Sequence, residues 1–138
     1  MKVLAAASEI YPLVKTGGLA DVVGALPGAL KPQGVAVKTL VPAYPAVAKA
    51  LGRGNVLHRY ADLFGGPATI IGGQVHGLDL LALDAPHLFK RPGNPYLGPD
   101  GKDWPDNAQR FAALSLAAAD VARGAIKGYG PDILHVHD

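Results

Sequence analysis

A strand, a glycine-containing loop, a helix and a second strand are predicted to follow one another over residues 2–41. Lys2–Ala7 and Val35–Val41 are short apolar runs without polar alternation, which is typical of parallel strands covered on both faces. Between them, apolar residues recur at helical spacing over Leu19–Lys31. Two strands joined in this way form a βαβ unit, whose crossover is right-handed. This unit restricts the chain to folds built on a parallel sheet.

The rest of the chain continues the alternation of strands and helices. Two further apolar runs flank a turn and predict a β-hairpin, and a long alanine-rich helix precedes a final strand. The expected segments are Ala68–Ile71, Leu78–Leu83, Asp106–Ala125 and Asp132–Val136. We predict an α/β fold with a Rossmann-like, doubly wound and mostly parallel sheet, in which Leu78–Leu83 and the first, second and last strands lie together.

Proline and glycine are concentrated in residues 84–102, between the hairpin and the last helix. We predict a long irregular loop there, and loops of this kind inside compact domains are often functional. Asp106 and Gln109 then have the spacing of a capping box, which predicts the start of the last helix.

Three unusual segments come directly after predicted strands. They are Ser8–Gly18, Pro42–Pro45 and His137–Asp138. Ligands of open parallel sheets bind beyond the carboxyl ends of the strands. We therefore expect the three segments to share one edge of the sheet and to form the candidate site.

The first of these segments contains the sequence KTGGLAD at residues 15–21. One interpretation is a flexible turn with a solvated Lys15. The other is an anion site, because a helix N-terminus offers unpaired N–H groups, glycines allow close approach, and Lys15 adds a positive charge. The motif is neither G-x-G-x-x-G nor a Walker A loop, so spacing alone leaves both interpretations open.

The last segment, HVHD, places His135 and His137 on one face of a strand. A zinc site is a poor interpretation, because a third strong ligand at short spacing is missing. Asp138 is better placed to accept hydrogen bonds from sugar hydroxyls. Glu9 and Tyr96 lie in predicted loops, where the pattern alone fits either a structural turn or a residue that faces a ligand.

Composition excludes several classes of protein. The net charge is only +2 and the basic residues are scattered, so neither nucleic acid nor an anionic membrane is an expected partner. No apolar run approaches the roughly 20 residues of a membrane span. The chain has no cysteine, which suits a cytoplasmic protein, and 138 residues are enough for one domain.

Several segments of the chain together resemble the sequences of a known enzyme family. MKVLAAASEIYPLVKTGGLADVVGALP is similar to the N-terminus of bacterial glycogen synthases and plant starch synthases. LVPAYP, DAPHLFKRPGNPYLGPDGKDWPDNAQRFAALSLAA and PDILHVHD continue the resemblance in the family's order, over the whole chain. The DAPHLF and RPGNPY segments suggest the bacterial glycogen type.

The resemblance implies a retaining glucosyltransferase that moves glucose from ADP-glucose to the 4-hydroxyl at the non-reducing end of an α-1,4-glucan. Such enzymes have the GT-B architecture, with two Rossmann-like domains and the active site between them. We expect no metal and no cofactor, and ADP-glucose and glycogen as the binding partners.

The resemblance also implies roles for single residues. Asp138 and Asp21 would be the catalytic residues of this chain, with Asp138 near the donor glucose. The substrate-binding residues would be Lys15 and Gly18 at the diphosphate, and Tyr96 and Glu9 in the cleft, which Asp21 would also line.

Members of the family are much longer than this chain. We interpret residues 1–138 as an incomplete N-terminal, acceptor-side domain without the C-terminal nucleotide-binding domain, and expect it to be inactive alone because it holds half a site. A non-catalytic module that binds glucan or a sugar phosphate is an alternative, and an unrelated flavodoxin-like domain is a third. The residues that would read the donor's base lie outside the chain.

Overall fold

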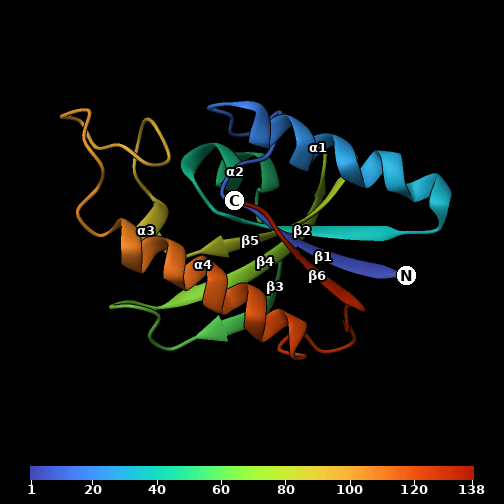
Figure 1. The fold of residues 1–138 in the computed structure, drawn as a ribbon. Helices are drawn as coiled ribbons and strands as arrows, with labels where there is room; N and C mark the ends of the chain where they lie inside the picture. Colours follow the sequence, from blue (N-terminus) through green and yellow to red (C-terminus); the bar gives the residue numbers. More distant parts are fainter.

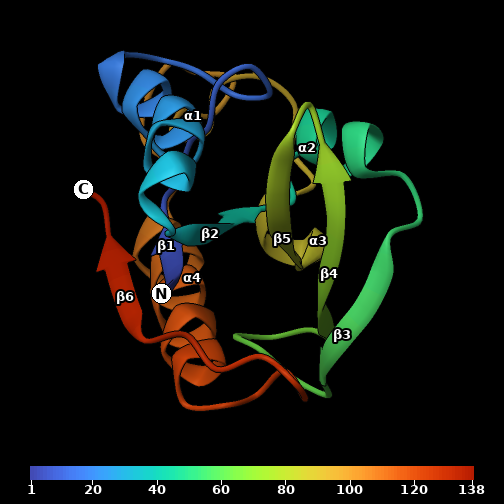
Figure 2. The same ribbon diagram turned by 90° about the vertical axis from the view of Figure 1, so that its right-hand side faces the viewer.

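The computed structural model describes all 138 residues. They form one six-stranded sheet with the strand order β3-β4-β5-β2-β1-β6. The strands are β1 (Lys2–Ala6), β2 (Ala36–Pro42), β3 (Asn55–Tyr60), β4 (Ala68–Val75), β5 (Leu78–Asp84) and β6 (Ile133–Val136). β5, β2, β1 and β6 are parallel, and β4 and β3 continue the sheet in antiparallel pairing. Figure 2 shows β3 and β6 at the two opposite edges.

Helices cover both faces of the parallel part of the sheet. They are α1 (Gly18–Leu30), α2 (Pro45–Leu51), α3 (Pro86–Phe89) and α4 (Asn107–Ala122), and a short 3₁₀ turn (Lys31–Gln33) follows α1. α1 and α4 lie on opposite sides of the central strands (Figure 1). No helix is long and apolar enough to span a bilayer.

The core explains why β1 has no polar alternation. Val3 and Ala5 belong to a small buried cluster against which Leu30 of α1 packs. Leu4 and Ala6 face the other way, into the large core cluster that also contains the buried alanines of α4. Both faces of the strand are therefore buried, as the apolar run predicted.

The predicted sheet is confirmed, with the first, second and last predicted strands and Leu78–Leu83 in it. Three elements were not predicted. α3 lies in the segment 84–102 that was predicted to be an irregular loop, and its four residues are too few to show a helical apolar pattern. β3 is an edge strand with mostly exposed residues, so its sequence, NVLHRY, has little apolar signal. α2 has seven residues and begins at Pro45, a position where the missing N–H costs nothing.

The hairpin strand β4 is longer than predicted, because it continues through Gly72 and Gly73 to Val75. A Cβ on Gly72 would lie 2.6 Å from a methyl carbon of Leu57, and one on Gly73 would lie 2.7 Å from a methyl carbon of Leu51. These glycines therefore make room for neighbouring side chains rather than ending the strand.

The predicted capping box at the start of α4 is wrong. Asp106 is the residue before the helix, but its side chain makes no capping hydrogen bond. Its two carboxylate oxygens accept instead from Arg91, at 2.7 and 2.6 Å. A bidentate pair with a guanidinium is stronger than a neutral cap, so the carboxylate turns toward Arg91. The helix also ends three residues earlier than predicted, at Ala122.

Two glycines of α1 provide a matched test of how closely the preceding loop packs against this helix. A Cβ on Gly24 would lie 2.6 Å from the carbonyl oxygen of Tyr11, whereas one on Gly28 would meet nothing within 4 Å. We expect Gly24→Ala to lower the free energy of unfolding by about 1–3 kcal/mol, because the loop before α1 must move away from the helix. Gly28→Ala should raise it by up to about 1 kcal/mol through helix propensity.

Urea unfolding of the two variants and the parent chain checks this expectation. Equal effects of the two substitutions would contradict the close contact between the loop and α1.

Candidate functional site

The candidate site lies where the parallel strands end. The carboxyl ends of β1, β2, β5 and β6 share one edge of the sheet, and the loop after β1, the residues after β6 and the start of α4 all lie there (Figure 1). A cleft of about 590 Å³ opens at this edge, between the end of β1, the start of α4 and the end of β6. Its polar lining includes Ser8, Tyr96, Asp103, Asn107, His137 and Asp138.

Six residues were predicted for the site, and the structure places five of them in two groups. Tyr96 and Asp138 line the cleft described above. Lys15, Gly18 and Asp21 lie together at the start of α1. None of the three lines this cleft, although Asp21 was predicted to, because its carboxylate pairs with Lys15 at the start of α1. The sixth, Glu9, is buried and accepts hydrogen bonds from Thr16, in the loop before α1, and from Tyr96.

Lys15 forms an ion pair with Asp21 and also donates a hydrogen bond to the carbonyl oxygen of Gly17, at 3.2 Å. The side chains of Lys15 and Asp21 are 42% and 55% exposed. An ion pair this exposed contributes little stability. The ammonium group is therefore held beside the helix N-terminus without being firmly bound there.

The two glycines of the loop are not required by the fold. Gly17 is the residue before α1 and makes no side-chain cap, and its φ of −161° is an extended conformation open to any residue. A Cβ on Gly17 or Gly18 would meet no atom within 4 Å. Neither a positive φ nor close packing within the chain therefore requires glycine at these two positions.

Glu9 is 3% exposed, and its carboxylate is fully engaged by donors from the chain. One oxygen accepts from the backbone N–H of Thr16 at 2.7 Å, and the other accepts from the hydroxyls of Thr16 and Tyr96. Burial acts to raise the pKa of Glu9, but these hydrogen bonds outweigh it and hold the pKa below its ordinary value. Glu9 is thus an ionised residue beneath the loop.

Tyr96 reaches the site from the long irregular segment before α4. Its hydroxyl donates to Glu9 and lies 2.7 Å from the hydroxyl of Ser8. Burial, and then the hydrogen bond to Glu9, raise the pKa of Tyr96 to about 12. The hydroxyl is therefore protonated at neutral pH and forms part of the cleft wall together with Ser8.

His135 and His137 lie on one face at the end of β6, as predicted, with ring centroids 4.2 Å apart. Burial, and then the neighbouring His135, lower the pKa of His137. His137 donates its backbone N–H to Ala6 at 3.0 Å, which ties the end of β6 to β1. This tie places the adjacent Asp138 at the cleft.

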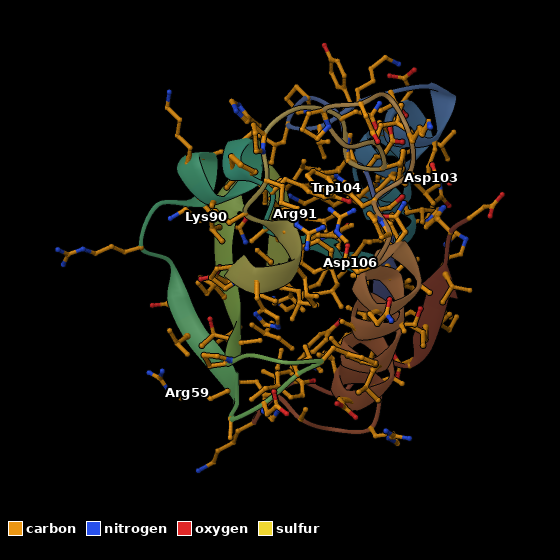
Figure 3. All side chains as sticks on the ribbon, turned by 90° about the vertical axis from the view of Figure 1, so that its left-hand side faces the viewer. Arg59, Lys90, Arg91, Asp103, Trp104 and Asp106 are labelled. Carbon is orange, nitrogen blue, oxygen red and sulfur yellow. The ribbon has the colours of Figure 1, made fainter.

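A cluster of charged and aromatic side chains fixes the long segment that carries Tyr96. The guanidinium of Arg91 lies 4.6 Å from the centre of the Trp104 ring, pairs with Asp106 and donates to the carbonyl of His87 at 3.0 Å. Figure 3 shows Arg91, Trp104 and Asp106 close together near the start of α4. Arg91, through its hydrogen bonds and charge, holds the pKa of Asp106 below its ordinary value despite partial burial.

Several residues that organise the site were not predicted from the sequence. Thr16 was quoted only as part of KTGGLAD, although it supplies two of the donors to Glu9. Ser8, Asn107 and Arg110 were not singled out either. Only Thr16 could have been recognised from the local sequence, by its hydroxyl beside the glycine pair. The other residues make contacts with residues far away in the sequence, which no short motif indicates.

The fold and its edge site define this chain as a Rossmann-like, doubly wound α/β domain. The family model described as the starch synthase catalytic domain matches residues 2–138, so the chain belongs to this family.

Similar proteins agree with this assignment. Glycogen synthase of Rhodopseudomonas palustris (strain HaA2) is 62% identical over 135 residues, which are 98% of this chain and 28% of that protein. Glycogen synthase of Acidiphilium cryptum (strain JF-5) is 60% identical over 138 residues, covering 100% of this chain and 29% of the relative. The chain therefore spans less than a third of the length of these relatives.

A solved structure also matches. The catalytic domain of starch synthase IV from Arabidopsis thaliana, bound to ADP and acarbose, aligns with a TM-score of 0.68 and 29% sequence identity. The match covers 99% of this chain and 27% of that one.

The depressed pKa of Glu9 predicts how acid affects stability. A carboxylate with a lowered pKa in the folded state contributes stability above its ordinary value of about 4.5, and this contribution is lost as the pH falls through the folded-state pKa. We expect Glu9→Gln to be less stable than the parent at pH 7, with a difference that shrinks steadily below about pH 4.5. Urea unfolding at a series of pH values measures this difference.

Tyr96→Phe is the companion variant, because it removes one donor and so raises the pKa of Glu9. In Tyr96→Phe, the stability contributed by ionised Glu9 should therefore be lost completely at a higher pH than in the parent. A constant difference between Glu9→Gln and the parent from pH 7 to pH 3 would contradict an ionised, hydrogen-bonded Glu9.

Proposed function

We propose that this chain is part of a glycogen synthase, which transfers glucose from ADP-glucose to the non-reducing end of an α-1,4-glucan with retention of configuration. Residues 1–138 form its acceptor-side Rossmann-like domain, and a second domain completes the site across the cleft. The family assignment and the similarity to bacterial glycogen synthases support this proposal. The presence of ADP and acarbose in the Arabidopsis structure supports a nucleotide and a saccharide as ligands.

The observation that carries the proposal is the glycine pair that the fold does not require. Gly17 and Gly18 stand at the N-terminus of a helix of 13 residues, with open space where their side chains would be. Backbone N–H groups at such a position bind a diphosphate, and a side chain on either glycine would hinder its approach. Lys15 beside them adds a charge-assisted contact.

The geometry also suits the chemistry of glucosyl transfer. When the bond between the anomeric carbon and the diphosphate breaks, negative charge accumulates on the departing ADP. The helix N-terminus and Lys15 stabilise that charge more strongly than the charge of the bound substrate, which lowers the barrier. The diphosphate takes Lys15 from Asp21 at little cost, because the ion pair between them is exposed.

The sugar occupies the cleft beside the diphosphate. The carboxylate of Asp138 accepts hydrogen bonds from glucose hydroxyls, and the protonated hydroxyl of Tyr96 lies in the same wall. Glu9 orients Tyr96 from below rather than contacting the sugar, because its oxygens already have partners from the chain. Asp21 keeps Lys15 at the helix N-terminus when no diphosphate is bound.

Lys15 provides the direct test of the diphosphate site. A charged hydrogen bond is worth roughly 1.5–3 kcal/mol, so its removal weakens binding by about ten- to a hundredfold. In the complete enzyme, we expect Lys15→Gln to raise the KM for ADP-glucose by that order and to change the dependence on glycogen much less. Steady-state kinetics in both substrates measures this.

Two further variants serve as a partial rescue and as a control for Lys15→Gln. Lys15→Arg should restore binding only in part, because a planar guanidinium fits a point-charge site poorly. Lys31→Gln, an exposed lysine beyond the other end of α1, is the matched control and should leave both KM values unchanged. An unchanged KM for ADP-glucose in Lys15→Gln would contradict the proposal that this loop binds the diphosphate.

A further inference from the structure

The backbone at Tyr96 is held on both sides. Its carbonyl oxygen accepts from the side-chain amide of Asn107 at 2.9 Å and from the backbone N–H of Trp104 at 3.2 Å. Its N–H donates to the side chain of Asn94 at 2.7 Å. The ring packs against Phe111 of α4, with centroids 5.7 Å apart. The Tyr96 hydroxyl therefore reaches the cleft from a backbone that the start of α4 anchors.

Behind this anchor lies a buried cation, Arg110, which is 1% exposed and has no carboxylate partner. Its guanidinium donates to the carbonyls of Leu88 and Pro95, at 2.6 and 2.9 Å. It also lies 5.4 Å from the ring centre of Phe89 and 5.4 Å from that of Phe111. Burying a charge is unfavourable unless hydrogen bonds satisfy it. Moving either carbonyl away would leave the buried guanidinium without one of its acceptors, so both carbonyls are held in place.

Arg110 also sets the orientation of the neighbouring amide. It donates to the Oδ1 of Asn107 at 2.8 Å. Because a guanidinium only donates, Oδ1 must face Arg110, and the Nδ2 of Asn107 must face the carbonyl of Tyr96. Arg110 thus acts on Tyr96 twice, through the carbonyl of the preceding Pro95 and through the amide of Asn107.

We propose that Arg110 and Asn107 are positioning residues that place the Tyr96 hydroxyl in the cleft, through the backbone of Pro95 and Tyr96. The hydroxyl is placed where a hydroxyl group of the saccharide binds. This last step rests on the proposed function, whereas the placement of Tyr96 does not.

Asn107→Asp tests the placement. The aspartate is isosteric, keeps an acceptor for Arg110 and is favourable in the first turn of a helix, so the chain stays folded. It has no donor for the carbonyl of Tyr96. We expect the Tyr96 hydroxyl to move away from Glu9, and its pKa to fall from about 12 toward the ordinary value of 10.0. A pH titration of ¹³Cζ-tyrosine by NMR, assigned with Tyr96→Phe, measures this pKa.

Asp120→Asn is the matched control on the same helix. Asp120 accepts from the hydroxyl of Tyr60 at 2.8 Å and contributes to raising the pKa of that tyrosine. The control should therefore lower the pKa of Tyr60 and leave that of Tyr96 unchanged. A Tyr96 pKa that stays at about 12 in Asn107→Asp, or that falls equally in Asp120→Asn, would overturn the proposal. Asn107→Ala, which removes both contacts, should give the same result as Asn107→Asp.

The complete enzyme supplies a second, independent readout. If Asn107 acts through Tyr96, then Asn107→Asp and Tyr96→Phe each lower kcat/KM, by about tenfold for a lost hydrogen bond, and the double variant loses no more than Tyr96→Phe alone. If the fold losses in kcat/KM of the two single variants multiplied in the double variant, Asn107 would not act through Tyr96 and the proposal would be overturned. Unchanged activity of Tyr96→Phe, together with a shifted pKa in Asn107→Asp, would support the positioning and remove Tyr96 from the proposed function.

Discussion

The buried carboxylate of Glu9 is the interaction on which the site depends. It joins two loops that are far apart in the sequence, because Thr16 donates to it from the loop before α1 and Tyr96 donates to it from the segment before α4. A buried carboxylate must keep its donors, since an unpaired charge in the interior is strongly unfavourable. The requirement fixes the glycine loop and the tyrosine relative to each other. One ionised group thereby sets the distance between the proposed diphosphate and saccharide positions.

Each of the two loops is also held from behind. The loop before α1 rests on its own helix, where Gly24 lets the carbonyl of Tyr11 approach closely and Tyr11 donates to the carbonyl of Ala20 at 3.0 Å. The segment before α4 is held by two arginines, one paired with Asp106 and the other buried among carbonyls. Lys15, the two glycines and Asp138 are among the groups left exposed at the edge, and they are proposed to meet the substrate. The scaffold is fixed by contacts within the chain, and the exposed groups stay free for a ligand.

The sheet and its functional edge were predictable because their causes are local. An uninterrupted apolar run such as Val3–Ala7 identifies a strand buried on both faces, and parallel strands must end at one edge. The exposed edge strand β3 lacks that apolar signal. The hydrogen bond from Tyr96 to Glu9 spans 87 positions, so no spacing rule indicates it. The capping box failed for a related reason, because Arg91, 15 positions before Asp106, competes for its carboxylate.

The KTGG loop is proposed to bind a diphosphate, and the other proposed roles at this edge depend on that binding. Backbone amide NMR of the ¹⁵N-labelled chain during titration with ADP tests it most directly, with AMP as the control that lacks the second phosphate. We expect saturable shifts of the amides of Thr16, Gly17, Gly18 and Leu19 with ADP, and weaker shifts with AMP. Shifts confined to another part of the surface, or identical shifts with ADP and AMP, would contradict it.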